Sequence, residues 1–206
     1  MATTLSPVVS SSHFVLHVPD SLRMTDEQLL EFCAVNSELR IERTAEGDLI
    51  IMPPAGGEAA EANIDIAFQL RLWAKRDGTG SAFDSSGGFT LPNGAMRSPD
   101  AAWILKTRWR KLSKEERRRF AHICPDFVIE LKSPSDSISI LKTKMEEWIA
   151  NGVRLGWMIH PDRQRVYVYR PNVAVEVLTN VTSVSADPEL SGFALDLSYI
   201  WDTDSE

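Results

Sequence analysis

The sequence predicts a single α/β domain in which a mixed sheet is flanked by helices. The chain has 206 residues, the size of one ordinary domain, and its 43% hydrophobic and 25% charged residues are normal for a protein with a packed core. Two long segments with helical spacing are separated by short apolar segments bounded by turn residues. No repeat or long linker divides the chain. These observations predict helices packed on a sheet rather than an all-helical or all-strand fold.

We expect a flexible leader at residues 1–22 and a single folded domain at residues 23–206. Thr25 and Gln28 fit a capping box at the start of a helix. The elements expected next are this helix, two strands of a hairpin and a long helix, at 26–36, 39–43, 49–52 and 58–77. The long helix has apolar positions at helical spacing, which predict its buried face: Ile64, Ala67, Phe68 and Leu72.

The rest of the chain predicts a meander, a second long helix and another hairpin. Ser113 with Glu116 predicts a short capped helix. The expected strands of the meander are 81–85, 88–91 and 97–105. An apolar strand is expected at 125–132 and the second long helix at 137–151. A hairpin follows, with strands at 154–160 and 165–170, and a last strand is expected at 175–178. We expect the remaining residues to form an irregular tail.

Charge and composition exclude several classes of protein. A net charge of −7 argues against indiscriminate binding to nucleic acid, which depends on phosphate neutralisation. The segment 106–119 is the exception, with eight basic and two acidic residues, and could contact a polyanion locally. No segment is apolar enough to span a membrane or to act as a secretory signal. Cys33 and Cys124 lack metal-ligand spacing, which favours reduced thiols in a cytoplasmic protein.

The apolar strand at 125–132 carries charges on one face. Side chains alternate along a strand, so Asp126, Glu130 and Lys132 share a face. Burial of such charges is unfavourable unless they are paired or bind a metal. A Glu130–Lys132 ion pair is the simplest structural explanation. Asp126 either lines a site or, as a strand-start acid, accepts backbone hydrogen bonds, and we favour the second interpretation.

Asp100 is a second acid in similar surroundings, because it follows a proline and opens an apolar strand. If that strand lies beside the strand of Glu130, the two carboxylates converge. At ~4 Å and an effective dielectric near 20, their repulsion would be ~4 kcal/mol. Lys132 would offset part of this repulsion, and a hard divalent cation would offset more. The sequence therefore predicts a cation site shared by Asp100 and Glu130.

Asp100 followed by Glu130–Leu131–Lys132 is also the pattern of the PD-(D/E)XK nuclease superfamily. The surrounding runs resemble the putative restriction endonuclease family, also called domain of unknown function 820, over about residues 24–178. These runs are Gly56–Glu58, Arg97–Asp100, Pro125–Asp136, Lys144–Trp148 and Gly152–Trp157. The sequence departs from the family pattern at Ala59, where many members have His, and at His160, where Asp often precedes the proline.

The resemblance implies a restriction-endonuclease-like fold and a metal-dependent endonuclease that hydrolyses DNA. It implies that Asp100 and Glu130, with the Leu131 carbonyl, hold Mg²⁺ or Mn²⁺. Lys132 would orient or help to deprotonate the attacking water, and Glu58 would add an acid to the site. Helix dipole stabilisation is the structural alternative for Glu58, and Glu61 is the competing acid. Positioned water and charge neutralisation are what phosphodiester hydrolysis requires.

Several basic residues are expected to contact DNA: Lys144, Arg108, Arg110, Lys111 and Arg118. Asp136 resembles the N-cap of the second long helix. Cleavage of both strands of a duplex favours a homodimer. Two other functions compete with the nuclease. One is a module on a nuclease fold that binds nucleic acid or protein without hydrolysis, and the other is a purely structural fold, which would leave Asp100 unexplained.

Overall fold

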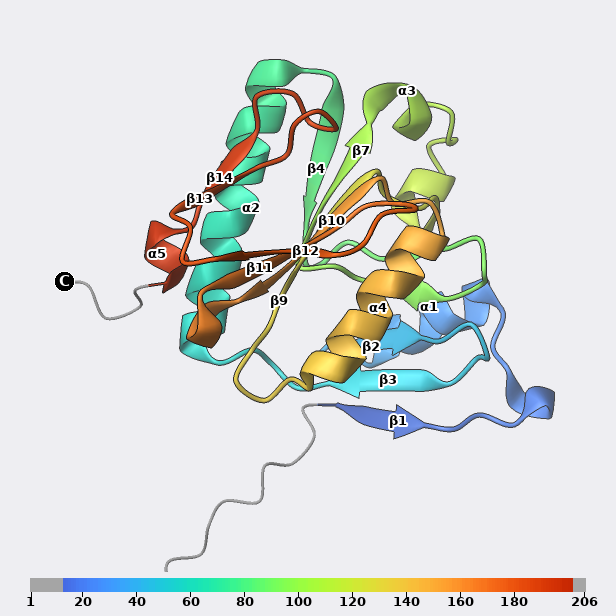
Figure 1. Ribbon diagram of the computed structural model, residues 1–206. Helices are drawn as coiled ribbons and strands as arrows, with labels where there is room; N and C mark the ends of the chain where they lie inside the picture. The colour runs from blue at the N-terminus through green and yellow to red at the C-terminus, as the bar shows by residue number, and fades with distance from the viewer. Residues whose placement is uncertain (1–12, 202–206) are drawn as a thin grey trace, which may run out of the picture.

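The computed structural model describes residues 13–201, which form two sheets, a small hairpin and flanking helices (Figure 1). The central sheet has the strand order β12-β11-β10-β9-β7-β4, with β9 and β10 parallel and all other pairs antiparallel. Its strands are β4 (Gly80–Asp84), β7 (Ala101–Leu105), β9 (Phe127–Leu131), β10 (Leu155–His160), β11 (Arg165–Tyr169) and β12 (Glu176–Thr179).

The second sheet is built mainly from the N-terminal half of the chain and has the order β1-β3-β2-β6-β5-β8. Its strands are β1 (Phe14–Leu16), β2 (Arg40–Arg43), β3 (Leu49–Met52), β5 (Phe89–Thr90), β6 (Met96–Arg97) and β8 (Ala121–His122). Within the predicted 1–22 leader, β1 pairs antiparallel with β3, and η1 (Asp20–Leu22) follows it. The earlier part of that leader, residues 1–12, lies outside the described residues.

Two long helices, α2 (Gly57–Asp77) and α4 (Ile138–Ala150), lie on opposite sides of the central sheet (Figure 1). Strand β9 shows the division: Phe127 and Ile129 join the core beneath α2, whereas Val128 joins the core beneath α4. The short elements are α1 (Asp26–Val35), α3 (Lys106–Trp109), η2 (Glu116–Arg118), η3 (Pro161–Arg163) and α5 (Ser198–Trp201).

Local chemistry explains many of the element boundaries. Thr25 and Gln28 form the predicted capping box before α1. Ser113 and Glu116 exchange hydrogen bonds of 2.7 and 3.1 Å in front of η2. Helix α2 ends at Gly78, whose φ of 74° is left-handed and suits glycine at a helix C-terminus. The hairpins at β2–β3 and β10–β11 are also confirmed.

The strand predicted at 97–105 is interrupted. Strand β6 ends at Arg97 and β7 begins at Ala101, with Ser98, Pro99 and Asp100 between them. Proline has no N–H to donate to a neighbouring strand, which explains the break. The interruption frees the Asp100 side chain to reach the end of β9, as described below.

Three other sequence predictions were wrong, namely the irregular tail, the N-cap of α4 and the buried face of α2. The C-terminal tail is not irregular, because β13 (Ser183–Ser185) and β14 (Ala194–Asp196) form a hairpin that packs with α5 beside α2. Asp136 does not cap α4; its carboxylate accepts from Ser133, and Ser137 is the N-cap.

The buried face of α2 is also not the predicted one. The helix buries Ala62, Ile66, Leu70 and Ala74, whereas Ile64, Phe68 and Leu72 are exposed. Both sets recur every four residues, so periodicity does not identify the set that meets the sheet. The hairpin β13–β14 covers one flank of the helix, where Gln69 bonds to Asp196. In residues 13–201, no helix is long and apolar enough to cross a membrane.

Candidate functional site

Asp100 and Glu130 meet at one end of the central sheet. Strands β7 and β9 pair antiparallel with Ala101 opposite Ile129, so the register continues to Asp100 opposite Glu130. Opposite residues of an antiparallel pair share a face. The Leu131 N–H donates to Asp100 Oδ2 over 2.8 Å, which fixes this carboxylate at the end of β9. Both acids line a cavity of about 630 Å³.

Helix α4 brings an ammonium group to the same acids. Lys144 Nζ lies 3.0 Å from Glu130 Oε1 and 3.3 Å from the Ser98 carbonyl oxygen. One helical turn later, Trp148 Nε1 donates to Glu130 Oε1 over 2.8 Å. Lys144 was predicted to contact DNA from this helix, but its ammonium is held by carboxylates of its own chain. Any contact with DNA stays a prediction.

Glu42 on β2 is a site residue that the sequence analysis missed. It is only 1% exposed, and its carboxylate accepts from Lys144 at 2.9 Å, Arg97 at 3.1 Å and the Ser98 N–H at 3.0 Å. Arg97 continues the network to Glu147 at 2.6 Å. A signal was present, since both Glu42 and its neighbour Arg43 are charged and only one face of a strand usually meets solvent.

Burial dominates the electrostatics of the acid pair. It raises the pKa of Glu130 to about 7; Lys144 opposes the rise, and Asp100 and Glu42 add to it. Burial also raises the pKa of Asp100, against the Leu131 N–H and Lys144. Burial acts to raise the pKa of Glu42 as well, but Lys144, Arg97 and the Ser98 N–H together outweigh it and lower that pKa. The cations of the site therefore stabilise Glu42 most, and Asp100 and Glu130 remain short of positive charge.

The residues present suit a divalent cation. The ion-paired network and Asp100 together hold four acids and two bases, an excess of two negative charges when all are ionised: Glu42, Asp100, Glu130 and Glu147 against Arg97 and Lys144. Arg40 and Asp136, which also act on Asp100, add one charge of each sign. Carboxylate and carbonyl oxygens are the ligands that Mg²⁺ prefers, and Mg²⁺ keeps several waters. Within residues 13–201, no three acidic, His or Cys side chains are grouped as a ready metal site. Two carboxylates with a backbone carbonyl and water are therefore the donor set to consider.

Comparison with known proteins identifies the family. Residues 26–198 match the model of the family described as "Uma2: Putative restriction endonuclease". The chain belongs to this family. A crystal structure described as a putative nuclease belonging to DUF820, from Anabaena variabilis, is similar at 25% identity with a TM-score of 0.66. The match covers 79% of this chain and 89% of that one, and it confirms the predicted restriction-endonuclease-like fold. No curated protein matches the chain.

Lys132, the lysine that the nuclease resemblance assigns to catalysis, lies next to the acid pair but does not touch it. Its ammonium donates to the Ser133 carbonyl over 2.8 Å and lines an adjoining cavity of about 350 Å³. Burial first, and then Lys132, lower the pKa of His160, which is its neighbour on β10. Glu58, in the first turn of α2, is exposed and lines both cavities. Its competitor Glu61 lines neither.

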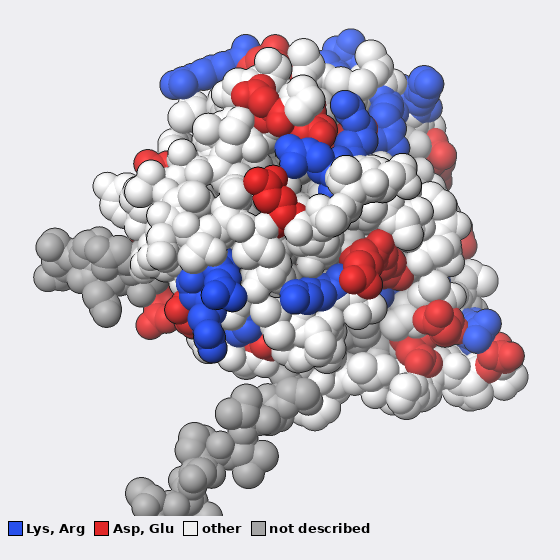
Figure 2. All heavy atoms as spheres, in the orientation of Figure 1, with Lys and Arg blue, Asp and Glu red and all other residues white. Residues whose placement is uncertain are grey.

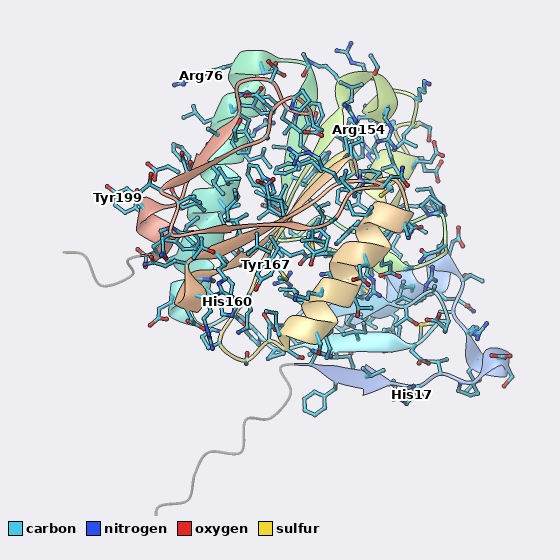
Figure 3. All side chains as sticks on the ribbon, in the orientation of Figure 1. His17, Arg76, Arg154, His160, Tyr167 and Tyr199 are labelled. Atoms are coloured by element: carbon cyan, nitrogen blue, oxygen red, sulfur yellow. The ribbon has the colours of Figure 1, made fainter. Side chains whose placement is uncertain are left out.

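The basic strip of this family member lies at the opposite end of the central sheet. It begins at α3, directly after β7, whereas Asp100 lies before β7. Figure 3 marks the two ends, with Arg154 just before β10 and His160 at its end. Figure 2 shows Lys and Arg gathered over α3. Arg108 pairs with the buried Asp126 at 2.8 Å, whereas three predicted DNA contacts are exposed: Arg110, Lys111 and Arg118.

Proposed function

We propose that this protein is a divalent-metal-dependent endonuclease that hydrolyses phosphodiester bonds of DNA. The observation that carries the proposal is the pair Asp100, just before β7, and Glu130, opposite it on β9. Both line a cavity and have raised pKa values. A buried acid pair short of cations is what a nuclease needs to bind a metal ion. Membership of a restriction endonuclease family supports the same activity.

Mg²⁺, or Mn²⁺ in its place, would be held by the carboxylates of Asp100 and Glu130 and by the Leu131 carbonyl. When bound, such a cation stabilises charge on the scissile phosphate and lowers the pKa of a bound water. Asp136 lines the same cavity, and its charge adds to the rise in the pKa of Asp100. Glu58 also lines this cavity, from the start of α2. We assign it a role in binding the cation or its waters.

The protein groups around the acid pair have positioning roles. Trp148 and Lys144 fix the Glu130 carboxylate, and the Leu131 N–H fixes that of Asp100. Glu42 in turn holds Lys144. Lys132 lines the adjoining cavity beside Glu58, from which its ammonium can orient the attacking water after leaving the Ser133 carbonyl. Preorganised groups of this kind lower the barrier because they need no rearrangement during the reaction.

The central test is nicking of supercoiled plasmid with Mg²⁺ or Mn²⁺. Asp100→Asn and Glu130→Gln remove charge with little change in shape, and each is expected to abolish nicking while the circular dichroism spectrum stays unchanged. Lys142→Ala is the matched control, because Lys142 lies on the exposed side of α4 over the Tyr167 ring. Calorimetry should show Mn²⁺ binding that disappears in Glu130→Gln. Nicking at the wild-type rate in both acid variants would contradict the proposal.

Two further variants separate the roles of the lysines. Lys132→Ala is expected to abolish nicking with Mn²⁺ affinity unchanged, because we assign it to the water and not to the cation. Lys144→Ala should change Mn²⁺ affinity as well as rate, because its ammonium contacts Glu130. If Lys132→Ala cleaves normally and Lys144→Ala does not, the lysine of the reaction is Lys144.

A non-hydrolytic binding module on the same fold is the second candidate. Its supporting observation is that Lys144 already neutralises part of the acid pair. DNA binding by gel shift without cleavage under any divalent metal would favour this module. A cytoplasmic location stays a prediction that rests on the two free cysteines.

A further inference from the structure

Helix α2 has an apolar face that points away from the core. Ile64, Phe68 and Leu72 are 70%, 61% and 37% exposed and recur every four residues. They form a continuous stripe about 12 Å long, since a helix rises 1.5 Å per residue. Contiguous exposed apolar surface on a soluble domain commonly marks an interaction site. The sheet covers the opposite side of α2, and β14 contacts one flank.

The charges beside this stripe are separated along the helix. Acidic residues, Glu61 and Asp65, precede Phe68, and basic residues, Arg71 and Lys75, follow it. Within residues 13–201, no ion pair is formed by Glu61, Arg71 or Lys75. Glu61 and Lys75 are therefore free to meet a partner that carries the reverse order of charge, whereas Asp65 accepts a hydrogen bond from Gln69.

A second α2 helix, running antiparallel, presents this reverse order. In a two-fold symmetric contact, residue i of one chain meets residue j of the other and the converse. A two-fold axis at Phe68 brings Ile64 against Leu72 of the second copy. The same axis brings Glu61 of each copy against Lys75 of the other, and these two residues are the rim charges of the contact. Asp65 and Arg71 lie on opposite flanks of the stripe and do not face each other across this axis. A parallel arrangement would instead place like charges together.

We propose that the outer face of α2 is a homodimer interface, with Phe68 at the two-fold axis and the two α2 helices antiparallel. The apolar stripe supplies the attraction, and the rim charges select the orientation. This inference specifies the homodimer expected for a nuclease that cuts both strands. It does not depend on catalysis, because the interface residues lie outside the cavity of Asp100 and Glu130.

Analytical ultracentrifugation over about 1–100 μM protein tests the interface without any nuclease assay. The wild type is expected to dimerise, and Phe68→Lys to weaken dimerisation at least 100-fold by placing two ammonium groups at the axis. Ile140→Lys is the matched control, because Ile140 is an exposed apolar residue, at 48%, on α4. It should dimerise as the wild type does. Phe68 is largely exposed, so its variant should keep the wild-type circular dichroism spectrum.

Charge reversal tests the orientation. Glu61→Lys and Lys75→Glu are each expected to weaken the dimer about 10-fold, because each creates two repulsive pairs. The double variant, which restores opposite charges, should recover most of the loss. In a Cys33→Ser background, Phe68→Cys should form a disulfide-linked dimer on oxidation, whereas Ile140→Cys should not.

Two results would overturn the proposal. One is a wild type that stays monomeric at 100 μM, and the other is a dimer that Phe68→Lys leaves intact. Failure of the proposed nuclease would look different, since plasmid would remain uncut while the sedimentation results followed the pattern above.

Discussion

The two ends of strand β9 each have a buried acid, and the two acids are in different electrostatic situations. Asp126 and Glu130 are 4% and 3% exposed. Asp126 accepts from the Leu105 N–H at 2.8 Å and pairs with Arg108 at 2.8 Å. Glu130 shares the Lys144 ammonium with Glu42 and faces Asp100.

The difference shows that burial of an acid does not by itself indicate a functional site. At the Asp126 end, one carboxylate has its own guanidinium and backbone N–H, so the group can serve stability. At the Glu130 end, carboxylates outnumber cations, and the protein bears an electrostatic cost there. Such a cost is typical of a site that binds a further cation. Substitutions at the Glu130 end should therefore lower activity most, and substitutions at the Asp126 end should lower stability most.

The largest expected effect is on the rate of DNA cleavage. Asp100→Asn or Glu130→Gln should lower the nicking rate at least about 100-fold, because loss of a metal ligand removes several kcal/mol of transition-state stabilisation. Asp126→Asn should keep most of the rate at a temperature where it remains folded. Initial nicking rates of the three variants measure the contrast. An equal loss of nicking rate in Asp126→Asn would contradict the assignment of the Glu130 end alone to catalysis.

For stability the order of the two ends should be reversed, with the larger loss at the Asp126 end. Asp126→Asn should lower the free energy of unfolding by about 1–3 kcal/mol, because its pairing with Arg108 and Leu105 is weakened in a buried place. The lower part of this range is expected, since the Arg108 side chain is 37% exposed and solvent screens the pair. Without metal, Glu130→Gln should cost less than Asp126→Asn. Urea denaturation of both variants provides the comparison.

The dependence of stability on pH should also separate the two ends. The pKa of Glu130 rises from 4.5 to about 7 on folding, so between these values the folded state binds more protons than the unfolded state. The free energy of unfolding should therefore fall as pH rises through this window in metal-free protein. Glu130→Gln should flatten that slope. Denaturation midpoints between pH 4.5 and 7 test this prediction. An unchanged slope would mean that groups other than Glu130 cause the pH dependence of stability.

The smallest expected effect concerns the basic strip at the Asp126 end. If Arg110 and Lys111 contact DNA phosphates, Arg110→Gln or Lys111→Gln should each reduce the salt-dependence slope of DNA binding by about 1. Arg76→Gln, an exposed arginine on α2, should leave the slope unchanged. Fluorescence anisotropy at several salt concentrations measures these slopes. No change in either strip variant would remove the strip from the DNA interface.

The extent to which the sequence predicts this fold depends on the source of each signal. Local chemistry was sufficient for the capping box of Thr25 and for the two predicted hairpins. The sequence analysis expected Asp100 and Glu130 to converge if their strands lie side by side, and the register of β7 and β9 shows that they do. These features depend on neighbours in sequence or on a strong alternation.

Features that depend on tertiary packing were less predictable. The Glu42 carboxylate reaches the site from the other sheet, 102 residues away from Lys144 in sequence, and no local pattern encodes that meeting. Helix α2 has two apolar stripes, so the buried one is decided by the sheet and by the β13–β14 hairpin. That hairpin itself was missed because its two short strands carry few periodic apolar positions.

The network of Glu42 has a consequence for how this molecule is assembled. Glu42 belongs to the sheet of β2, Glu130 to the central sheet and Lys144 to α4, and one ammonium joins all three. The correct geometry at the acid pair therefore exists only when both sheets have docked. A chain with its N-terminal sheet displaced would keep its central core but lose the Glu42 carboxylate that helps to hold the Lys144 ammonium. Activity of the acid pair should thus report whether the two sheets have docked.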